Sequence, residues 1–403
     1  MGYCKNFRLI LCVYFINPRG KKQEIYNAVL NSSYEIVKNR DLILGFAKNW
    51  CDETKTFVFK WGEVTITVLG HSVFDLVDIE CEAKQVLRKL NEARAELHKS
   101  KYNKTDQFGW MKKFKDSGSE IEHEAFLALW LSQFVFPCTY GTVSTNVSAI
   151  AVCLAKGVRL ALAPPVLASI YRDLSLLNHN LGNDGHDDES NLIVWAPFQL
   201  VQVWILERFR KISPNCVGSC SPRFARWENK KLLVENVGSF VDCCFDDFIW
   251  QPFGEVLNDK SGKWVVVAEC LDEELESWVR CLRVSELVGM DGKYIEQYLP
   301  HRVAMQFGMN QDVPGDVARM NGNRGIAWRF YTRLVKDVKV YIPSGLFEPY
   351  VTVRYLEWWN KSTGECSLQS TIDDNKTDKF GKDESSIEGS EDSVDVDTMG
   401  FEL

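Results

Sequence analysis

The chain has 403 residues, 45% of them apolar with 13 Trp and 23 Phe, which is enough for a sizeable buried core. Its formal net charge of -8 is uneven: residues 365–403 hold 12 Asp and Glu against three Lys, a balance of -9, which leaves +1 for residues 1–364. A body so close to neutral excludes a strongly basic nucleic-acid-binding protein and an acidic buffer protein.

The N-terminal part changes its hydrophobic period twice. Residues 1–20 are interpreted as an irregular segment, because the apolar run Leu9–Ile16 is at the short limit for a signal peptide and no small-residue cleavage site follows. A helical pattern runs from Lys22 to Trp50, with a break expected at Asn39–Asp41. Strict alternation then predicts a β-hairpin around Trp61-Gly62, with apolar positions at Phe57, Phe59, Val64, Ile66 and Val68.

The middle of the chain is the most apolar part. Residues 80–99 predict an amphipathic helix, and residues 99–118 predict an exposed polar loop. Three core helices follow within 122–177: one ends before Pro137, one covers about 146–162, and one opens on Pro164-Pro165. Because these helices are apolar on most faces, we expect them to form the core of the domain.

The rest of the chain mixes helices with short strands. We expect a polar loop at 178–191, a buried helix at 197–209, a linker at 211–221, strands at 240–245 and 264–268, and helices at 273–287, near 303–307 and at 347–359. The acidic residues 362–403 have few large apolar side chains and predict a disordered tail. The predicted class is therefore α+β, predominantly α-helical, with one body at 21–361.

Motifs for common chemistry are missing from the sequence. It has no phosphate-binding loop, no dinucleotide fingerprint and no nucleophile elbow. A metal site at His179, Asp184, His186 and Asp187 lacks a calcium-loop or zinc spacing, and so does one at Cys216, Cys220, Cys243 and Cys244. We predict no catalytic, cofactor-binding or metal-binding residue. The 13 cysteines are scattered in apolar patterns, which favours reduced thiols in the cytosol or nucleus.

One segment suggests nucleic-acid contact. Basic residues alternate with aromatic ones near the C-terminus of the body, and the candidate nucleic-acid-binding residues are Arg324, Arg329, Arg333, Lys336 and Lys339. The alternative is that Trp328, Phe330 and Tyr331 belong to the core and the basic residues form their solvated rim. The near-neutral body favours this alternative.

Seven collinear blocks closely resemble the plant mobile domain family, which is often labelled "aminotransferase-like" and includes the maintenance-of-meristems proteins. The blocks are RDLILGFAKNWCDETKTFVFKWGEVTIT (40–67), EAFLALWLSQFVFP (124–137), LAKGVRLALAPPVLASIYRDLSLL (154–177), WAPFQLVQVWILERF (195–209), CLRVSELVG (281–289), YLPHRVAMQFGMNQDVPG (298–315) and YIPSGLFEPYVTVRYLEWW (341–359). The chain departs from the family pattern directly after Thr67, where it lacks residues of a helix that would cover the hairpin.

The resemblance implies a nuclear protein without an established catalytic site. Family members are associated with transposon and gene silencing, genome integrity and meristem development. Some relatives act with a phosphatase-like partner. The resemblance therefore implies protein partners, phosphatase-like or chromatin-associated, with nucleic acid as a further candidate and no membrane. A transposable-element-encoded accessory protein of the same family is one alternative, and an uncharacterised enzyme is another. The search for a pyridoxal-phosphate framework finds no alternation of strands with helices, in agreement with a non-enzymatic role.

Overall fold

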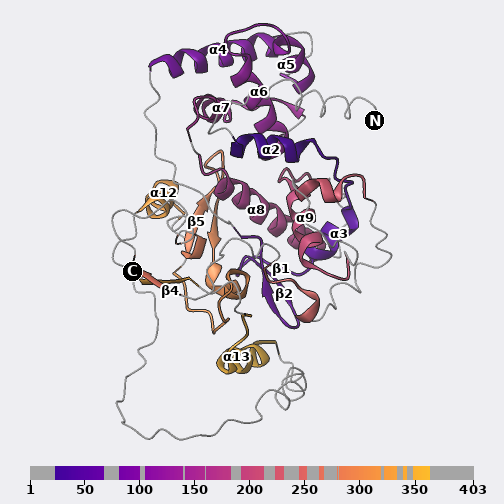
Figure 1. The fold of residues 1–403 in the computed structure, drawn as a ribbon, viewed down its shortest axis with the longest axis vertical. Helices are drawn as coiled ribbons and strands as arrows, with labels where there is room; N and C mark the ends of the chain where they lie inside the picture. The colour runs from indigo at the N-terminus through magenta and orange to yellow at the C-terminus, as the bar shows by residue number, and fades with distance from the viewer. Residues whose placement is uncertain are drawn as a thin grey trace, which may run out of the picture.

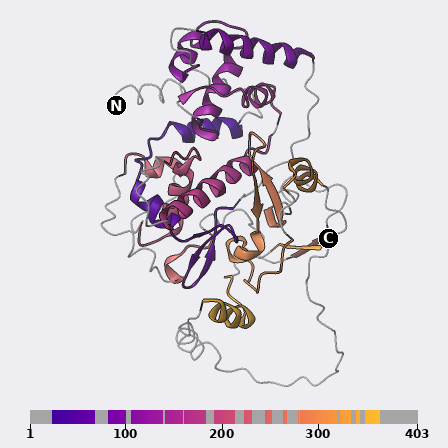
Figure 2. The same cartoon turned by 180° about the vertical axis from the view of Figure 1, so that it is seen from behind.

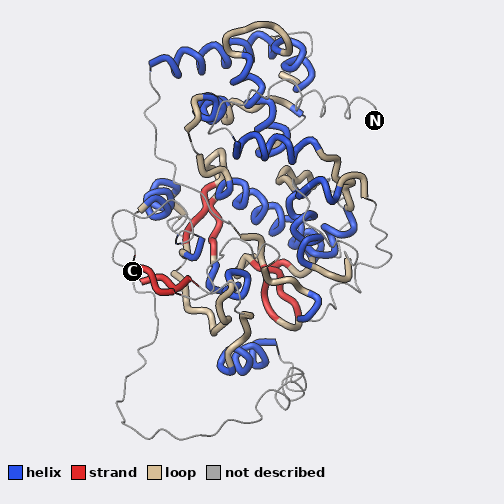
Figure 3. The backbone as a smooth tube through the Cα atoms, viewed as in Figure 1, coloured by secondary structure: helices blue, strands red, loops and turns tan. Residues whose placement is uncertain are grey.

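A computed structural model describes most of the body of the protein. The described residues are 23–67, 81–99, 105–138, 141–158, 160–182, 192–212, 223–230, 245–251, 263–266, 279, 281–318, 322–333, 339–342 and 348–363. Five predictions fall wholly or largely outside them: the irregular segment 1–20, the polar loop 178–191, the linker 211–221, the strand 240–245 and the tail 362–403. Within the described residues, helices dominate and short strands form three small sheets, which confirms the predominantly helical α+β class (Figures 1 and 3).

The first helices and the hairpin follow the predicted order. Helices α2 (Gln23–Ser33) and α3 (Arg40–Ala47) are separated by residues 34–39, so the break begins earlier than the predicted Asn39–Asp41. The Asn39 side chain accepts a hydrogen bond from the Leu42 N–H at 2.9 Å and caps α3. Strands β2 (Thr56–Phe59) and β3 (Gly62–Val64) pair antiparallel as the predicted hairpin. A third strand, β1 (Trp50–Cys51), pairs with β2 and was not expected.

A group of helices lies at the top of Figure 1, and one of them, α5 (Gln107–Phe114), occupies a segment predicted to be an exposed loop. The group comprises α4 (Cys81–His98), α5, α6 (Glu122–Trp130) with the π-helical turn η1 (Leu131–Val135), and α7 (Ser148–Ala155). The predicted exposed loop at 99–118 is wrong over α5, where Trp110 is 1% exposed and its Nε1–H donates to the Ala125 carbonyl at 2.9 Å. Only Trp110 and Phe114 mark the buried face, so the polar residues around them concealed the helix. The helix predicted to reach residue 162 ends at Ala155, because Gly157 adopts a left-handed φ of 81°.

Helix α8 (Ala163–Gly182) lies between the upper helices and the sheets in both views (Figures 1 and 2). It contacts α3, β1, β5 and β6. Its fully buried Asp173 accepts hydrogen bonds from the Trp195 and Ala196 N–H groups, both at 2.7 Å, just before α9 (Phe198–Arg208). The polar loop predicted at 178–191 is wrong over residues 178–182, where α8 continues to Gly182, and the rest of it lies outside the described residues. Among the described residues, no helix combines the length and apolar character that crossing a membrane requires.

The C-terminal half of the body alternates short strands with helices. Its elements are the 3-10 turns η3 (Arg223–Trp227) and η4 (Phe245–Asp247), strands β4 (Lys263–Val266), β5 (Ser285–Val288), β6 (Ile295–Tyr298) and β7 (Lys339–Ile342), the 3-10 helix η5 (Pro300–Phe307), and helices α12 (Arg324–Thr332) and α13 (Val353–Thr363). β4 pairs with β7 and β5 pairs with β6, both antiparallel. The helix predicted at 273–287 is wrong at its end, because residues 285–287 alternate between buried and half-buried positions and pair with β6.

The β5–β6 turn gives a stability prediction. A Cβ added at Gly289 would lie 2.2 Å from a ring atom of Tyr294, and the Gly289 N–H donates to the Tyr294 carbonyl at 3.0 Å. We expect Gly289→Ala to lower the free energy of unfolding by about 1–3 kcal/mol through overpacking. Denaturant unfolding measures the change, and Gly315→Ala is the control because its Cβ would have no neighbour within 4 Å. Equal stability of the two variants would contradict the predicted clash.

Candidate functional site

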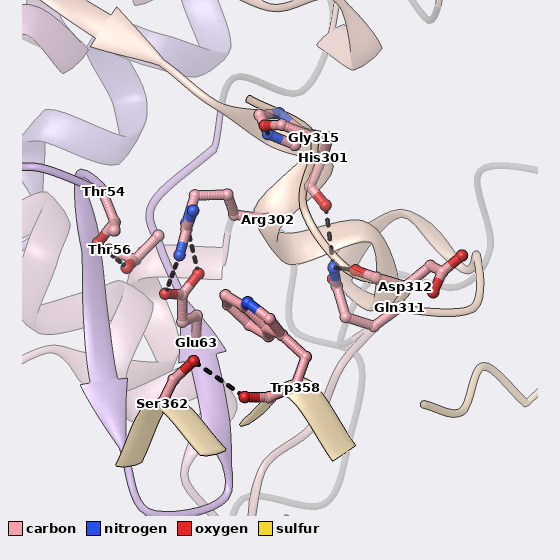
Figure 4. Close-up of polar contacts among 10 residues, drawn as sticks. All are labelled: Thr54, Thr56, Glu63, His301, Arg302, Gln311, Asp312, Gly315, Trp358 and Ser362. Atoms are coloured by element: carbon pink, nitrogen blue, oxygen red, sulfur yellow. Dashed lines mark hydrogen bonds and ion pairs between the residues drawn. The ribbon is translucent and has the colours of Figure 1, made fainter. Parts of the chain in front are cut away.

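Residues 298–315 connect two parts of the chain that are distant in sequence. They comprise the end of β6, η5 and the loop after η5, and they lie against the hairpin and α13 (Figure 4). A left-handed φ of 77° at Gly308 ends η5. We call the contacts of residues 298–315 with the hairpin and α13 the hairpin joint.

Glu63 and Arg302 form a buried ion pair in the hairpin joint. The Arg302 Nε–H and Nη2–H groups donate to the two carboxylate oxygens of Glu63 at 2.7 and 2.6 Å. The side chain of Glu63 is 3% exposed, and the Arg302 guanidinium also lies 5.9 Å from the Trp358 ring centre (Figure 4). Burial raises the pKa of Glu63, and the hydrogen bonds and charge of Arg302 oppose that rise. The carboxylate therefore depends on Arg302 to stay ionised.

The side-chain amide of Gln306 pairs with the backbone of Thr65, the residue after β3. Its Oε1 accepts from the Thr65 N–H at 2.8 Å, and its Nε2 donates to the Thr65 carbonyl at 2.9 Å. The hydroxyl of Tyr171 on α8 donates to the next carbonyl, that of Ile66, at 2.7 Å. The residues after β3 thus have their backbone groups satisfied by side chains from η5 and α8.

Lys55, at the start of the hairpin, is held between two acids. Its ammonium group contacts the carboxylates of Asp52 and Glu296, the latter at 2.6 Å. Asp52 also accepts from the hydroxyl of Ser175 on α8. Burial alone would lower the pKa of Lys55, but the two acids together raise it above its ordinary value. Burial alone would raise the pKa of Asp52, but its hydrogen bonds from Lys55 and Ser175 lower it.

The lowered pKa of Asp52 predicts a dependence of stability on pH. Because the pKa is lower in the folded than in the unfolded chain, the stabilisation is present above the unfolded value near 3.8 and is lost as pH falls through the folded value. We expect the free energy of unfolding to fall less steeply in Asp52→Asn than in the native chain between about pH 5 and pH 2. Urea unfolding across this range measures the slopes, with the exposed Asp316→Asn as the control. Identical slopes in Asp52→Asn and the native chain would contradict the role of Asp52.

Gln311 and Asp312 fasten α13 to the hairpin joint. The Gln311 N–H donates to the Tyr350 carbonyl, and the Thr352 N–H donates to the Gln311 carbonyl, both at 2.9 Å. Asp312 accepts two hydrogen bonds from Arg354, whose guanidinium lowers the pKa of the Asp312 carboxyl. At the other side of the joint, the Trp359 indole N–H donates to the Lys60 carbonyl in the hairpin turn at 2.9 Å. Residues from three distant parts of the chain therefore form one connected structure.

A family model for the plant mobile domain matches residues 24–360 of this chain. The chain belongs to the plant mobile domain family. The matched region runs from α2 into α13. It therefore includes the three parts of the hairpin joint, which are the hairpin, residues 298–315 and α13 up to residue 360. No curated protein and no solved structure matches the chain.

The joint brings together three of the blocks that carry the plant mobile domain resemblance. Glu63 and Thr65 belong to 40–67, Arg302 and Gln306 to 298–315, and Trp359 to 341–359. None of these residues is among the predicted site residues. A charged or amide residue inside an otherwise apolar block could have indicated them, because such a residue is rarely buried unless its polar group is paired. The departure from the family pattern after Thr67 concerns residues outside the described part of the chain.

The candidate nucleic-acid-binding residues are placed in part. Arg324 and Arg329 lie on α12, Arg333 directly follows it and Lys339 begins β7, all with exposed side chains, whereas Lys336 is outside the described residues. Trp328, Phe330 and Tyr331 are half-buried, and Ala327 between them and the helix start is fully buried. The aromatic residues therefore take part in packing, with the basic residues around them at the surface. Their contact with nucleic acid stays a prediction.

The candidate metal residues are mostly outside the described part of the chain. His179 lies on α8, while Asp184, His186, Asp187 and the four cysteines Cys216, Cys220, Cys243 and Cys244 are not described. Over the residues that are described, no group of three or more His, Cys, Asp and Glu could hold a metal ion.

Proposed function

We propose that this plant mobile domain protein is a non-enzymatic nuclear protein that acts through protein partners in transposon and gene silencing, genome integrity and meristem development. Family membership supports the class of protein. The observation that carries the proposal is the use of buried charges: Glu63 with Arg302 and Lys55 with Glu296 are paired to each other inside the fold. Each of these charges has its counter-charge inside the fold, which favours a structural role for the four side chains. A transposable-element-encoded accessory protein of the same family is the close variant.

The proposal of protein partners is tested by proximity labelling with the full chain in plant nuclei. We expect enrichment of a reproducible set of nuclear proteins, phosphatase-like or chromatin-associated, over a labelling enzyme that carries only a nuclear import signal. A tagged chain should also accumulate in the nucleus. Exclusion of the full chain from the nucleus, or a labelled set identical to that of the control, would contradict the proposal.

The competing function is that of an enzyme, and its pyridoxal-phosphate version has a direct test. A lysine aldimine absorbs visible light, so purified full-length protein mixed with pyridoxal phosphate would gain an absorbance band that borohydride removes. We expect no such band at equimolar cofactor. A stable band that follows the protein through gel filtration would favour the enzyme over the interaction protein.

Nucleic acid is a second candidate partner, which the exposed arginines of α12 favour. Residues 317–336 contain four Arg and one Lys and no acidic residue. If this surface binds DNA or RNA, reversing Arg329, Arg333 and Lys336 to Glu should abolish salt-sensitive binding. Contacts of basic side chains with phosphates supply the salt-sensitive part of the binding free energy. Fluorescence anisotropy at low salt measures the binding, with the triple variant Lys84→Glu, Lys99→Glu and Lys112→Glu, on and next to α4 and α5, as the charge-matched control. Lack of binding by the native chain at low salt would end this candidate.

A further inference from the structure

Helix α9 ends in a buried arginine that has no acidic partner. Arg208 is 2% exposed, and its Nη1–H groups donate to the carbonyls of Ile249 and Trp250 at 3.1 and 2.6 Å. Its guanidinium lies 5.6 Å from the ring centre of Trp204 and 5.5 Å from that of Phe248. Its Nε–H is buried and has no acceptor within the described part of the chain. Burial, unopposed by any acid there, lowers the pKa of Arg208 to about 9.

This arginine differs from the other buried cations of the molecule. Arg302 and Lys55 each have a carboxylate oxygen within 2.6 Å. Arg172 offers the closest comparison, because its guanidinium also stacks on a ring, 4.4 Å from the centre of Tyr294, and pairs with the buried Asp173 at 2.5 Å. A buried charge is costly unless a counter-charge and hydrogen bonds satisfy it. At Arg208 the carbonyls satisfy only part of the guanidinium, and the counter-charge is missing among the described residues.

Three indole N–H groups around Arg208 have the same deficit. Trp61, Trp204 and Trp250 each have a buried Nε1–H without an acceptor, so four of the eight buried unpartnered side-chain atoms in the described structure belong to this one region. All three indoles touch Phe248, with ring centres 5.6, 6.2 and 4.9 Å away respectively. We call Arg208, Trp61, Trp204, Phe248 and Trp250 the Arg208 cluster. Because buried polar groups in folded proteins are almost always hydrogen-bonded, four unpartnered donors on residues that pack around Phe248 indicate a missing acceptor.

The chemistry of the cluster specifies that acceptor. Guanidinium and indole N–H groups only donate, so the group that satisfies them must be rich in acceptors. The positive charge of Arg208 requires that it be an anion. A planar carboxylate matches the donor geometry of a guanidinium and is flat enough to lie between aromatic rings. The cluster is therefore suited to the side chain of an Asp or Glu residue in an acidic peptide.

An acidic peptide begins close to the Arg208 cluster. Helix α13 ends at Thr363, one turn after Trp359, whose indole N–H donates to the carbonyl of Lys60, the residue before Trp61. At the other end of α13, Tyr350 packs on Phe245 with ring centres 5.8 Å apart, and Phe245 packs on Trp250 at 5.3 Å. The chain that continues from α13 carries 12 acidic residues against three lysines in 365–403.

We propose that the Arg208 cluster is a carboxylate-binding site and that an Asp or Glu residue of the chain's own segment 365–403 occupies it. The positive charge and the unpartnered donors define the site, and the contacts of Trp359 with Lys60 and of Tyr350 with Phe245, with the acidic sequence that follows α13, favour this occupant. Binding of this segment places an acidic residue against the aromatic core and links the C-terminal segment to α9.

A double-mutant cycle on the full-length chain tests the proposal. One variant is Arg208→Met, and the other is a tail-neutral chain in which the 12 acidic residues of 365–403 are changed to Asn or Gln. With the native tail, we expect Arg208→Met to reduce the ratio of folded to unfolded protein by about ten-fold or more, because a hydrogen-bonded carboxylate loses its partner. In the tail-neutral chain the same change should cost much less, because the lost hydrogen bonds to the Ile249 and Trp250 carbonyls are offset by the removal of an uncompensated buried charge. Arg172→Met is the matched control, and its effect should be the same with both tails because its acid is Asp173. An equal effect of Arg208→Met with both tails overturns the proposal.

A second measurement does not require any change in the Arg208 cluster. Indole N–H signals of Trp61, Trp204 and Trp250, assigned by single Trp→Phe variants, should shift upfield in the tail-neutral chain because they lose a charged acceptor. Addition of a synthetic peptide of residues 364–403 to the tail-neutral chain should reverse the shift. If the three signals do not move, or if the peptide fails to restore them, the segment is not the occupant and the proposal is wrong.

Discussion

Replacing Arg302 with methionine is expected to lower the free energy of unfolding by about 3–5 kcal/mol, the largest single effect in the hairpin joint. The change leaves the Glu63 carboxylate, 3% exposed, without the two hydrogen bonds that oppose the effect of burial on its pKa. The carboxyl must then take up a proton or draw water into the joint, and either change weakens the attachment of η5 to β3. Urea unfolding at neutral pH measures the loss.

The double variant Glu63→Gln with Arg302→Met distinguishes the cost of an unpaired Glu63 carboxylate from the cost of the lost packing of Arg302. It should recover a large part of the lost stability, because no unpaired charge remains inside the joint. Arg354→Met is the control for an arginine lost from an exposed ion pair and should change stability little, because the backbone hydrogen bonds of Gln311 to Tyr350 and Thr352 still attach α13. If Arg302→Met is no less stable than Arg354→Met, the ion pair does not hold the joint. If the double variant is no more stable than Arg302→Met alone, the loss comes from packing and not from the stranded carboxylate.

The elements that the sequence predicted well are those in which local pattern and tertiary environment agree. The hairpin around Trp61-Gly62 follows from strict alternation, and the break before α3 follows from Asn39 as a helix cap. The start of α8 at Ala163 follows from Pro164-Pro165 in its first turn. In each case a short stretch of chain contains the whole signal.

Other features were not predictable because their cause lies far along the chain. Glu63 and Arg302 are 239 positions apart, so no local pattern connects them. The local pattern of residues 285–287 predicts the end of a helix. These residues form strand β5 because they pair with β6, which lies beyond a turn at Gly289 and Gly292. Helix α5 was concealed because two buried aromatic residues suffice to hold it on the core. The candidate site therefore depended on tertiary contacts that only the structure reveals.

Replacing Gln306 with leucine is expected to lower the free energy of unfolding by about 2–6 kcal/mol, the other large effect in the hairpin joint. Leucine fills a similar volume but cannot hydrogen-bond, so the N–H and carbonyl of Thr65, a residue only 2% exposed, lose both partners. Two buried backbone groups without partners each cost about 1–3 kcal/mol, which sets the expected range. Gln297→Leu is the control, because that amide makes one exposed hydrogen bond to the Ala318 carbonyl at 3.0 Å.

Hydrogen exchange distinguishes a local from a global origin of this loss. In the native chain the Thr65 amide is bonded to Gln306 and should exchange slowly, through large openings only. In Gln306→Leu it should exchange faster than the amides of Phe57 and Val64, which the hairpin ladder still pairs. Because Tyr171 continues to donate to the Ile66 carbonyl, opening should stop within one or two residues of Thr65. Uniform acceleration along the hairpin would show instead that Gln306 stabilises the fold as a whole and not the end of β3.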